Sequence, residues 1–573
     1  MIRRNFARLR AAGTAVPALV LAVLYGAAAA QESPPPAPDA PADRVFLGTI
    51  YTARDDRPVV EAVAVRGGRI VETGDSVDVL QQRGPLTEVI ELDRDAALFP
   101  GFTDAHAHLL GIGQRELTLN LEGVDSIEAL KAAVRAEAER TQAGGVIFGR
   151  GWIETHWPEK RFPTRHDLDD AAPGHAVILV RADGHALAAN SLALQRAGIT
   201  AETPDPAGGR IERDETGAAT GVLIDAAMKP VMALVQAPTA AEKIKAYVKA
   251  GRLYAERGWT GVHNMSVDPE DISVMEDLAG AGMLPLRVYN SIDRAGADDL
   301  LRSGPRSGAG GRIVTRAVKL YMDGALGSRG AALFEPYADK PDTKGLILME
   351  RKKTLPLLKE ALEEGIQVNT HAIGPRANRL VLDWYAEAFA AVPPDEREIA
   401  GPRWRIEHAQ IIHPTDIPRF AELDVIASMQ PSHAIGDLHF APARLGEERL
   451  KGAYAWKSLV ENGAVVAGGS DAPVEAGSPL IEFYAAVARK DLKGFSGAGW
   501  HPEEALERQT ALKLFTAWAA YAAFQEDELG TIEPGKAADF TVFSKDIMKV
   551  PAEEIPKARA IMTVIGGDVV YKE

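Results

Sequence analysis

The sequence predicts an α/β fold, a (β/α)8 TIM-like barrel, from two observations. The middle of the chain alternates short apolar runs with stretches of helical periodicity, as parallel βα units do. Eight such runs can be counted, and most of them end in a polar or charged residue. The eight strands are expected at residues 97–104, 259–263, 285–290, 315–322, 366–371, 403–408, 425–430 and 464–470.

Residues 1–30 have the layout of a secretory signal peptide. Four arginines precede an apolar stretch over residues 14–25, and a run of alanines follows it. The stretch is too short for a comfortable membrane span, and an uncleaved anchor is the alternative. The pair Arg3-Arg4 also resembles a twin-arginine signal. We therefore expect an exported, periplasmic protein that carries a Sec or twin-arginine signal.

The rest of the chain divides into a linker, a β-rich domain and the barrel. Residues 31–43 are rich in proline and alanine and predict an extended linker. β-rich runs occur over 44–97 and again over 530–573, so we expect both ends to form one composite β-sandwich domain. The barrel occupies 98–529. Because the gap between its first two strands is too long for one crossover, residues from about 121 to 250 should form an inserted subdomain.

The composition excludes several classes of partner and chemistry. Of 573 residues, 46% are hydrophobic and 25% charged, as in a globular protein with a large core, and the formal net charge is −16. A negative surface disfavours nucleic acid and anionic membranes. The absence of cysteine excludes disulfides, thiolate metal sites and a thiol nucleophile. We expect a small-molecule substrate, no nucleic-acid partner and no stable membrane span after signal cleavage; the composition is compatible with a homo-oligomer.

Two histidines after the first predicted strand indicate a metal site. His106 and His108 follow the break at Pro100-Gly101, and side chains two residues apart in an extended strand point to one face. Neutral imidazole is the commonest metal ligand in proteins. The alternative is a strand end with two exposed or hydrogen-bonded histidines.

Four further groups lie at or near the ends of predicted strands. Lys319 interrupts an apolar run, His371 and His408 end their strands, and Asp471 follows two glycines and a serine. Because the active site of a barrel lies at the C-terminal ends of its strands, we expect these groups to meet. The alternatives are a snorkelling or salt-bridged lysine, two core histidines and a capping aspartate.

Together these segments resemble the amidohydrolase superfamily, most closely its YtcJ-like branch (amidohydrolase family 3). The matching segments, in chain order, are PGFTDAHAH, KLYMDGALGSRGA, NTHAIG, RIEHAQ, SMQPSH, GSDAPVE and GTIEPGKAADFTVF. They run through nearly the whole chain after the linker. One position departs from the family pattern: Pro375, where aspartate is usual, which puts the carry-over of fine specificity in doubt.

The resemblance implies a binuclear centre with two divalent metal ions, expected to be Zn²⁺. His106, His108 and Asp471 would hold one ion, and His371 and His408 the other. A carboxylated Lys319 would bridge them, which agrees with the chemistry because burial lowers the pKa of a lysine and favours the neutral amine that carboxylation needs.

The expected reaction is hydrolysis of a C–N bond in an amide, N-acyl compound or cyclic amide. Hydroxide held by the metals would attack the carbonyl, and Asp471 would carry its proton to the leaving nitrogen. Alternatives within the superfamily are a mononuclear deaminase and an esterase. A different class, a non-catalytic binding or regulatory protein on this scaffold, also stays open.

Other residues are candidates for substrate contact. His185 is expected to contact substrate or polarise its carbonyl, with a structural hydrogen bond as the alternative. For the other candidates, the alternative is packing, a surface position or a salt bridge within a loop. His263 is expected behind the metal site. The remaining candidates are Trp152, Trp157, Asp183, Ser328, Arg329, Gln430 and His433.

The sequence lacks the motifs that are typical of several other enzyme classes. Gly324-x-x-Gly327-x-x-Gly330 lacks dinucleotide-binding spacing. No Gly-x-Ser-x-Gly elbow and no His-Glu-x-x-His motif occurs in the sequence, so serine-hydrolase and zincin chemistry have no support.

Overall fold

The computed structural model describes residues 40–573. The predicted signal peptide and nearly all of the predicted linker lie outside these residues. Within the described part of the chain, no helix is both long enough and apolar enough to cross a membrane.

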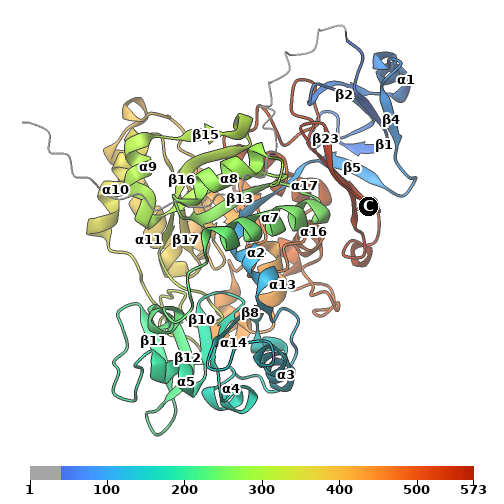
Figure 1. Cartoon of the computed structure of the whole chain (residues 1–573). Helices are drawn as coiled ribbons and strands as arrows, with labels where there is room; N and C mark the ends of the chain where they lie inside the picture. Colours follow the sequence, from blue (N-terminus) through green and yellow to red (C-terminus); the bar gives the residue numbers. More distant parts are fainter. Residues whose placement is uncertain (1–39) are drawn as a thin grey trace, which may run out of the picture. The chain divides into compact units, whose positions relative to one another are not determined.

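The centre of the fold is a parallel sheet of eight strands that curls into a barrel (Figure 1). The ladder runs in the order β20-β19-β18-β17-β16-β14-β13-β6. Beyond β20 the circle closes onto the first strand, where Asp471 N donates to His106 O at 2.7 Å. The strands in chain order are β6 (Phe102–Ala107), β13 (Trp259–Val267), β14 (Arg287–Asp293), β16 (Ile313–Tyr321), β17 (Gln367–Ala372), β18 (Arg405–His408), β19 (Ile426–Met429) and β20 (Val466–Gly468), with β15 (Arg306–Gly308) antiparallel to β16.

Amphipathic helices follow the barrel strands and cover them. In α11, Val381, Leu382, Tyr385 and Ala388 are buried, which places one apolar stripe against the sheet. This helix begins at Pro375, whose missing N–H is tolerated at a first helical position. The main helices are α2 (Leu109–Leu117), α7 (Ala240–Arg257), α8 (Asp271–Gly280), α9 (Ala297–Ser303), α10 (Arg351–Glu363), α11 (Pro375–Ala391), α12 (Ile417–Glu422), α13 (Pro431–Asp437), α14 (Ala441–Leu445), α15 (Trp456–Glu461), α16 (Pro479–Ala488), α17 (Arg508–Leu514) and α18 (Ala517–Ala522).

The first predicted strand, 97–104, is in fact two strands in two different sheets. β5 (Ala97–Pro100) pairs with β21 (Phe540–Phe543) outside the barrel, whereas β6 belongs to the barrel. The chain passes from one sheet to the other at Gly101. A side chain does not fit there, because a Cβ would lie 2.2 Å from Thr260 Oγ1. The prediction was wrong here because a continuous apolar run carries no signal for a change of sheet.

The two ends of the described chain share one sheet of eight strands (Figure 1). Its order is β23-β22-β21-β5-β1-β2-β3, with β4 paired to β1. Phe46 and Phe540, from opposite ends of the sequence, meet in its core with ring centroids 5.4 Å apart. The other elements are β1 (Arg44–Tyr51), β2 (Val59–Arg66), β3 (Arg69–Gly74), α1 (Ser76–Val79), β4 (Glu88–Glu91), β22 (Ala560–Ile565) and β23 (Asp568–Lys572).

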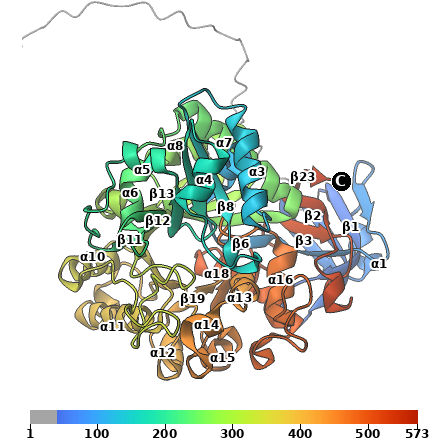
Figure 2. The same cartoon turned by 90° about the horizontal axis from the view of Figure 1, so that it is seen from below.

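An inserted sheet interrupts the barrel between β6 and β13 (Figure 2). Its order is β11-β12-β10-β9-β8-β7. Helix α7 begins within the range predicted for the insertion but packs on α2 and β13, so it belongs to the barrel. The insert consists of β7 (Leu119–Asn120), α3 (Ile127–Ala138), β8 (Val146–Trp152), α4 (Arg165–Ala171), β9 (Ala176–Arg181), β10 (Ala186–Ala189), α5 (Ser191–Arg196), β11 (Gly209–Arg213), β12 (Ala219–Asp225) and α6 (Lys229–Met232).

Candidate active site

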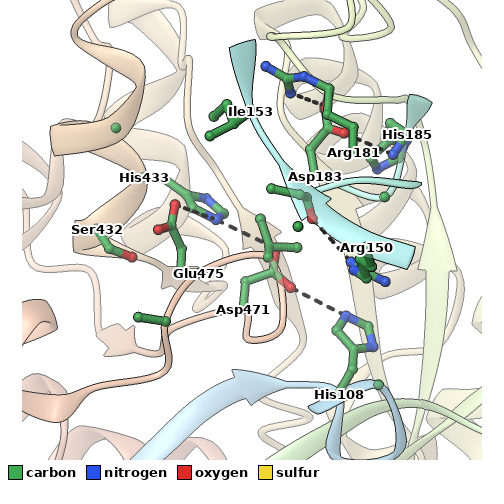
Figure 3. Close-up of a pocket in the computed structure, with 18 of the residues that line it drawn as sticks. His108, Arg150, Ile153, Arg181, Asp183, His185, Ser432, His433, Asp471 and Glu475 are labelled. Atoms are coloured by element: carbon green, nitrogen blue, oxygen red, sulfur yellow. Dashed lines mark hydrogen bonds and ion pairs between the residues drawn. The ribbon is translucent and has the colours of Figure 1, made fainter. Parts of the chain in front are cut away.

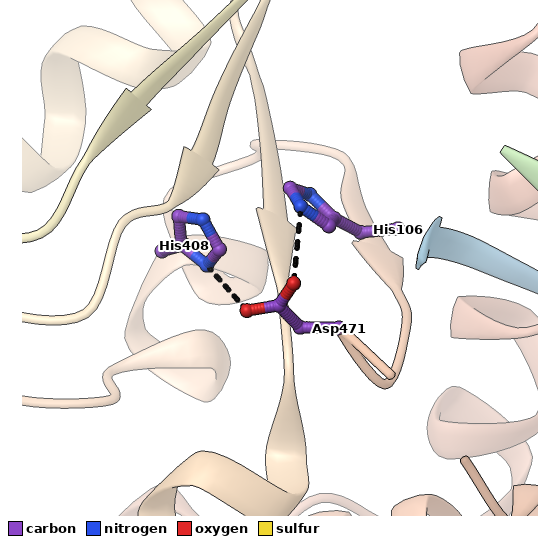
Figure 4. A group of neighbouring side chains, drawn as sticks. All are labelled: His106, His408 and Asp471. Atoms are coloured by element: carbon purple, nitrogen blue, oxygen red, sulfur yellow. Dashed lines mark ion pairs between the residues drawn. The ribbon is translucent and has the colours of Figure 1, made fainter. Parts of the chain in front are cut away.

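Three buried side chains meet where the barrel closes (Figure 4). His106 comes from β6, His408 from the end of β18 and Asp471 from the turn after β20. One ligand atom from each lies within 4.8 Å of the others. Asp471 Oδ1 is 3.5 Å from His106 Nε2, and Asp471 Oδ2 is 3.9 Å from His408 Nδ1. This is a donor set of two imidazoles and one carboxylate, which suits a divalent transition metal.

Unusual backbone geometry accompanies this cluster. His408 (φ 75°) and Asp471 (φ 58°) adopt the left-handed conformation, which is rare for residues other than glycine and concentrates at functional sites. At Gly469 a Cβ would lie 2.5 Å from His106 N, so only glycine lets the end of β20 approach β6.

Lys319 enters the same cluster from the middle of the barrel. Its Nζ lies 3.2 Å from His106 Nε2, and the side chain is buried. Burial lowers the pKa of Lys319 to about 8, although Glu407 and Asp471 oppose the shift. A substantial fraction of this amine is therefore neutral near pH 8.

His371 and His108 complete the predicted ligand set. His371 Nε2 is buried without a hydrogen-bond partner, and the nearest carboxylate oxygen, Asp323 Oδ1, is 3.6 Å away. The His371 ring lies 4.5 Å from that of His408, and His108 Nε2 is 3.3 Å from Asp471 Oδ1. The structure thus brings all six predicted ligands together, and the buried ring nitrogen of His371 that lacks a hydrogen-bond partner is available to coordinate a metal ion.

The buried histidines are held as neutral ligands. Burial lowers the pKa of His106, His371 and His408 well below the ordinary value, with Lys319 contributing in the same direction for each. A neutral imidazole keeps the lone pair that coordinates a metal.

Several residues that sequence reasoning missed hold the ligands in place. Glu407 Oε2 accepts a hydrogen bond from His106 Nδ1 at 2.6 Å, which leaves Nε2 for the metal side. Asp104 accepts from Ser470 N and Oγ, at 2.8 and 2.5 Å, and so anchors the turn that carries Asp471. Both residues lie in the family-like segments, Glu407 directly before His408 and Asp104 two residues before His106, which is the only signal the sequence offered.

A cavity of about 1090 Å³ opens over the cluster. Its lining comes from the barrel, including His108, Lys319, His371, His408 and Asp471, and from the inserted sheet. The insert contributes Arg150, Ile153, Arg181, Asp183 and His185, which Figure 3 shows around the pocket.

His185 is held by a carboxylate from the neighbouring strand. Its Nδ1 lies 2.6 Å from Asp225 Oδ1, and its ring is 5.3 Å from that of His371. Burial opposes the charged form, but Asp225, with Asp183 and Asp323, raises the pKa of His185 to about 9. His185 is therefore a cation at neutral pH on the wall of the cavity.

The motif Gly324-x-x-Gly327-x-x-Gly330, which lacks dinucleotide-binding spacing, has a structural explanation. A Cβ at Gly324 or Gly330 would lie 2.8 Å from Asp225 Oδ2, and one at Gly327 would lie 2.9 Å from Arg181 Nη1. These glycines let charged side chains of the insert dock closely on the loop after β16.

Trp152 and Trp157 do not form a wall of the cavity. Both are buried in the core of the insert, where Trp152 Nε1 donates to Leu179 O at 2.9 Å and Trp157 Nε1 donates to Val124 O at 2.7 Å. Substrate contact by Trp152 was the wrong prediction because the strand register shifts between Arg150 and Trp152. Arg150 lines the cavity, whereas Trp152 lies in the core of the insert.

Ser328 and Arg329 also lie away from the cavity lining. Ser328 Oγ donates to Ala325 O at 3.3 Å, and Arg329 pairs with Asp339 at 2.8 Å. The loop salt bridge, the alternative to carboxylate binding, is what the structure shows.

The other substrate candidates have mixed outcomes. Asp183 and His433 line the cavity, although Asp183 is also paired with Arg181 at 2.7 Å. Gln430 instead accepts from His408 Nδ1 at 2.8 Å and orients that ring. His263 is buried behind the site and accepts from Arg405 at 2.9 Å.

Known proteins match this chain over nearly its whole length. Residues 88–571 match the model of the "Amidohydrolase family". The putative amidohydrolase YtcJ of Bacillus subtilis is 34% identical over 92% of this chain and 98% of its own length. An N-substituted formamide deformylase of Arthrobacter pascens is 28% identical over 92% of this chain and 98% of its own.

A solved structure shares the fold as well. An uncharacterized metal-dependent hydrolase from Pyrococcus horikoshii superposes with a TM-score of 0.70 at 27% identity. The match covers 89% of this chain and 99% of the other.

Proposed function

Because the chain belongs to the amidohydrolase family, we propose that it is a metal-dependent hydrolase that cleaves a C–N bond in an amide, N-acyl compound or cyclic amide. The observation that carries this proposal is the convergence of six candidate metal ligands, five of which line one cavity, with His371 Nε2 buried and without a hydrogen-bond partner. The formamide deformylase among the relatives acts on a bond of this type by its name, which favours C–N cleavage.

We propose that this ligand set would hold two divalent ions, Zn²⁺. His106, His108 and Asp471 would hold one ion, His371 and His408 the second, and a carboxylated Lys319 would bridge them. When bound, the metal supplies Lewis-acid chemistry that polarises a carbonyl and lowers the pKa of water. The neutral amine that burial gives Lys319 supports its carboxylation.

The residues around the ligands provide proton transfer and positioning. Asp471 lies between the two histidine pairs and faces the cavity, so it can accept a proton from water and give it to the leaving nitrogen. His185, protonated and fixed by Asp225, faces the same cavity and can donate a hydrogen bond to the carbonyl oxygen as negative charge develops there.

The first test is metal content and activity together. Protein purified without chelator should hold close to two ions per chain by elemental mass spectrometry, and it should hydrolyse members of an amide and N-acyl library. Lys319→Met should lose the second ion and the activity, whereas Lys451→Met, a matched change at an exposed lysine, should keep both.

The outcomes separate this proposal from its alternatives. A single ion with ammonia release from an amidine-like compound would favour the mononuclear deaminase. Hydrolysis of esters but of no amide would favour the esterase. Absence of metal, with no activity restored by added divalent ions, would replace the enzyme with a binding protein.

Export remains a separate proposal that rests on residues 1–30. Expression of the full chain, followed by cell fractionation and mass spectrometry of the product, tests it. A periplasmic product shortened by about 30 residues is expected; a full-length product in the membrane fraction would indicate an anchor.

A further inference from the structure

Arg150 differs from Arg181, the other arginine among the described residues that line the cavity, because it has no acidic partner within ion-pair distance. Arg181 pairs with Glu154 and Asp183, and Lys243 pairs with Asp271, although both also line the cavity. Arg150 makes one hydrogen bond, from Nη2 to the carbonyl oxygen of Ala182 at 3.1 Å. Among residues 40–573, no carboxylate lies within the 4.0 Å that defines an ion pair with its guanidinium group.

The guanidinium group also keeps unused donor capacity. Arg150 Nε is buried without a hydrogen-bond partner. An arginine has five N–H donors in a planar fork, stays charged, and is costly to bury unpaired. Burial lowers the pKa of Arg150, and Asp471 and Asp183 oppose this shift without forming an ion pair with its guanidinium group. Such a group is stabilised by an anionic ligand that fits the fork.

The surroundings leave room for that ligand. Gly184, in the left-handed conformation, lies beside the guanidinium, where a Cβ would be 3.3 Å from Nη2. His185, the second cation of this wall, follows it in the chain. In Figure 3, Arg150 and His185 lie on one side of Asp471, and His433 and Glu475 lie on the other. The cavity, about 1090 Å³, exceeds what a simple amide group fills.

We propose that Arg150 is a specificity-determining residue that binds a carboxylate of the substrate, so that the enzyme acts on amides that carry a free carboxylate, such as N-acyl amino acids or amides of dicarboxylic acids. Arginine and carboxylate form two parallel charge-assisted hydrogen bonds, and this pairing excludes a neutral amide group from the same contact. This inference rests on the proposed amide hydrolysis and names its substrate class.

Matched substrates test the inference by kinetics. N-formylphenylalanine and N-formylphenethylamine differ only in a carboxylate on the amine side, and succinanilic acid and butyranilide differ in one on the acyl side. We expect wild-type kcat/KM to favour the carboxylate in at least one pair by between about tenfold and a hundredfold. Arg150→Gln should abolish that preference mainly through KM, and Arg150→Lys should restore part of it because lysine keeps the charge but not the fork.

A binding measurement tests the carboxylate site independently of the hydrolysis reaction. Calorimetry with 3-phenylpropionate and 3-phenylpropionamide is made on the metal-loaded protein and again after chelation, so that a carboxylate bound to metal is recognised. Lys493→Gln, a change at an exposed cation of the same cavity, is the control for the general field. We expect Arg150-dependent binding of the carboxylate in both preparations.

Each result decides between distinct conclusions. Hydrolysis of both members of each pair at equal kcat/KM, unchanged in Arg150→Gln, would overturn the inference and leave the hydrolase proposal standing. Equal binding of 3-phenylpropionate by wild type and Arg150→Gln would also overturn it. Arg150-dependent binding without hydrolysis of any amide would support the carboxylate site and count against the proposed reaction.

Discussion

The barrel wall and the insert wall of the cavity are built in different ways. On the barrel side, His106 and His408 are buried, burial lowers their pKa, and each is fixed by a partner: His106 by Glu407, His408 by Gln430. On the insert wall, Arg150, Arg181 and His185 face the cavity beside Asp183, and Arg150 is left without an ion pair. The difference indicates that the strands hold the reaction centre rigidly while the insert provides charge for recognition, as in barrels whose loops set specificity.

Asp471 on the barrel wall should show the largest effect. Asp471→Asn keeps the shape but cannot take a proton, so kcat should fall by about 10²–10⁴-fold. Steady-state kinetics together with metal content per chain measure this. Asp125→Asn, a change at an exposed carboxylate lining the same cavity, should leave kcat unchanged. Wild-type-like kcat in Asp471→Asn would remove this residue from proton transfer.

Glu407 should matter through His106. Glu407→Gln weakens the bond at 2.6 Å to His106 Nδ1 and should lower metal affinity by about 10–100-fold. Activity should recover when metal is added in excess, which a change in the fold would not allow. Competition with a chelating dye gives the affinity, with Glu422→Gln, an exposed glutamate at the end of α12, as the control.

Lys319 should give the barrel wall a defined pH dependence. Its pKa is lowered from 10.5 to about 8, so the neutral amine increases as pH rises towards 8 and levels off above it. Reactivation of chelated enzyme by metal at a fixed concentration of dissolved carbon dioxide should therefore accelerate by about tenfold per pH unit below pH 8. Under that condition, a rate independent of pH, or reactivation without any need for carbon dioxide, would contradict carboxylation of this lysine.

Asp225 provides the corresponding test on the insert wall. Asp225→Asn removes the charge that holds His185 and should lower kcat/KM by about tenfold. Gly330→Ala should act in the same direction, since its Cβ would lie 2.8 Å from Asp225 Oδ2. Gly174→Ala, with nothing within 4 Å, is the control. Loss of metal in Asp225→Asn would show that the insert wall also contributes to metal binding.

Trp152 should have the smallest effect on catalysis. Trp152→Ala should destabilise the protein by about 3–5 kcal/mol, because it opens a hole in the core of the insert. KM and kcat measured well below the melting temperature should stay unchanged. A selective rise in KM would place this tryptophan in substrate binding after all.

The reaction centre was more predictable from the sequence than the recognition wall. His106, His371 and His408 end strands that have a strong apolar pattern, so their convergence follows from barrel geometry. The predicted contact between Trp152 and the substrate was wrong because the insert has short strands and the register of these strands was not predicted. The assignment of Arg329 was wrong because its partner, Asp339, lies in an irregular loop without periodic signal.

The sequence by itself determined the type, order and strand-end positions of the candidate metal ligands, because these depend on local apolar patterns and on the repeated βα unit. Only the tertiary structure decided which groups support them and which stay unpaired. Glu407 and His106 are 301 residues apart, and Asp225 reaches the glycines after β16 across the insert. Contacts at such separation are set by barrel closure and by the docking of the insert, neither of which leaves a periodic trace in the chain.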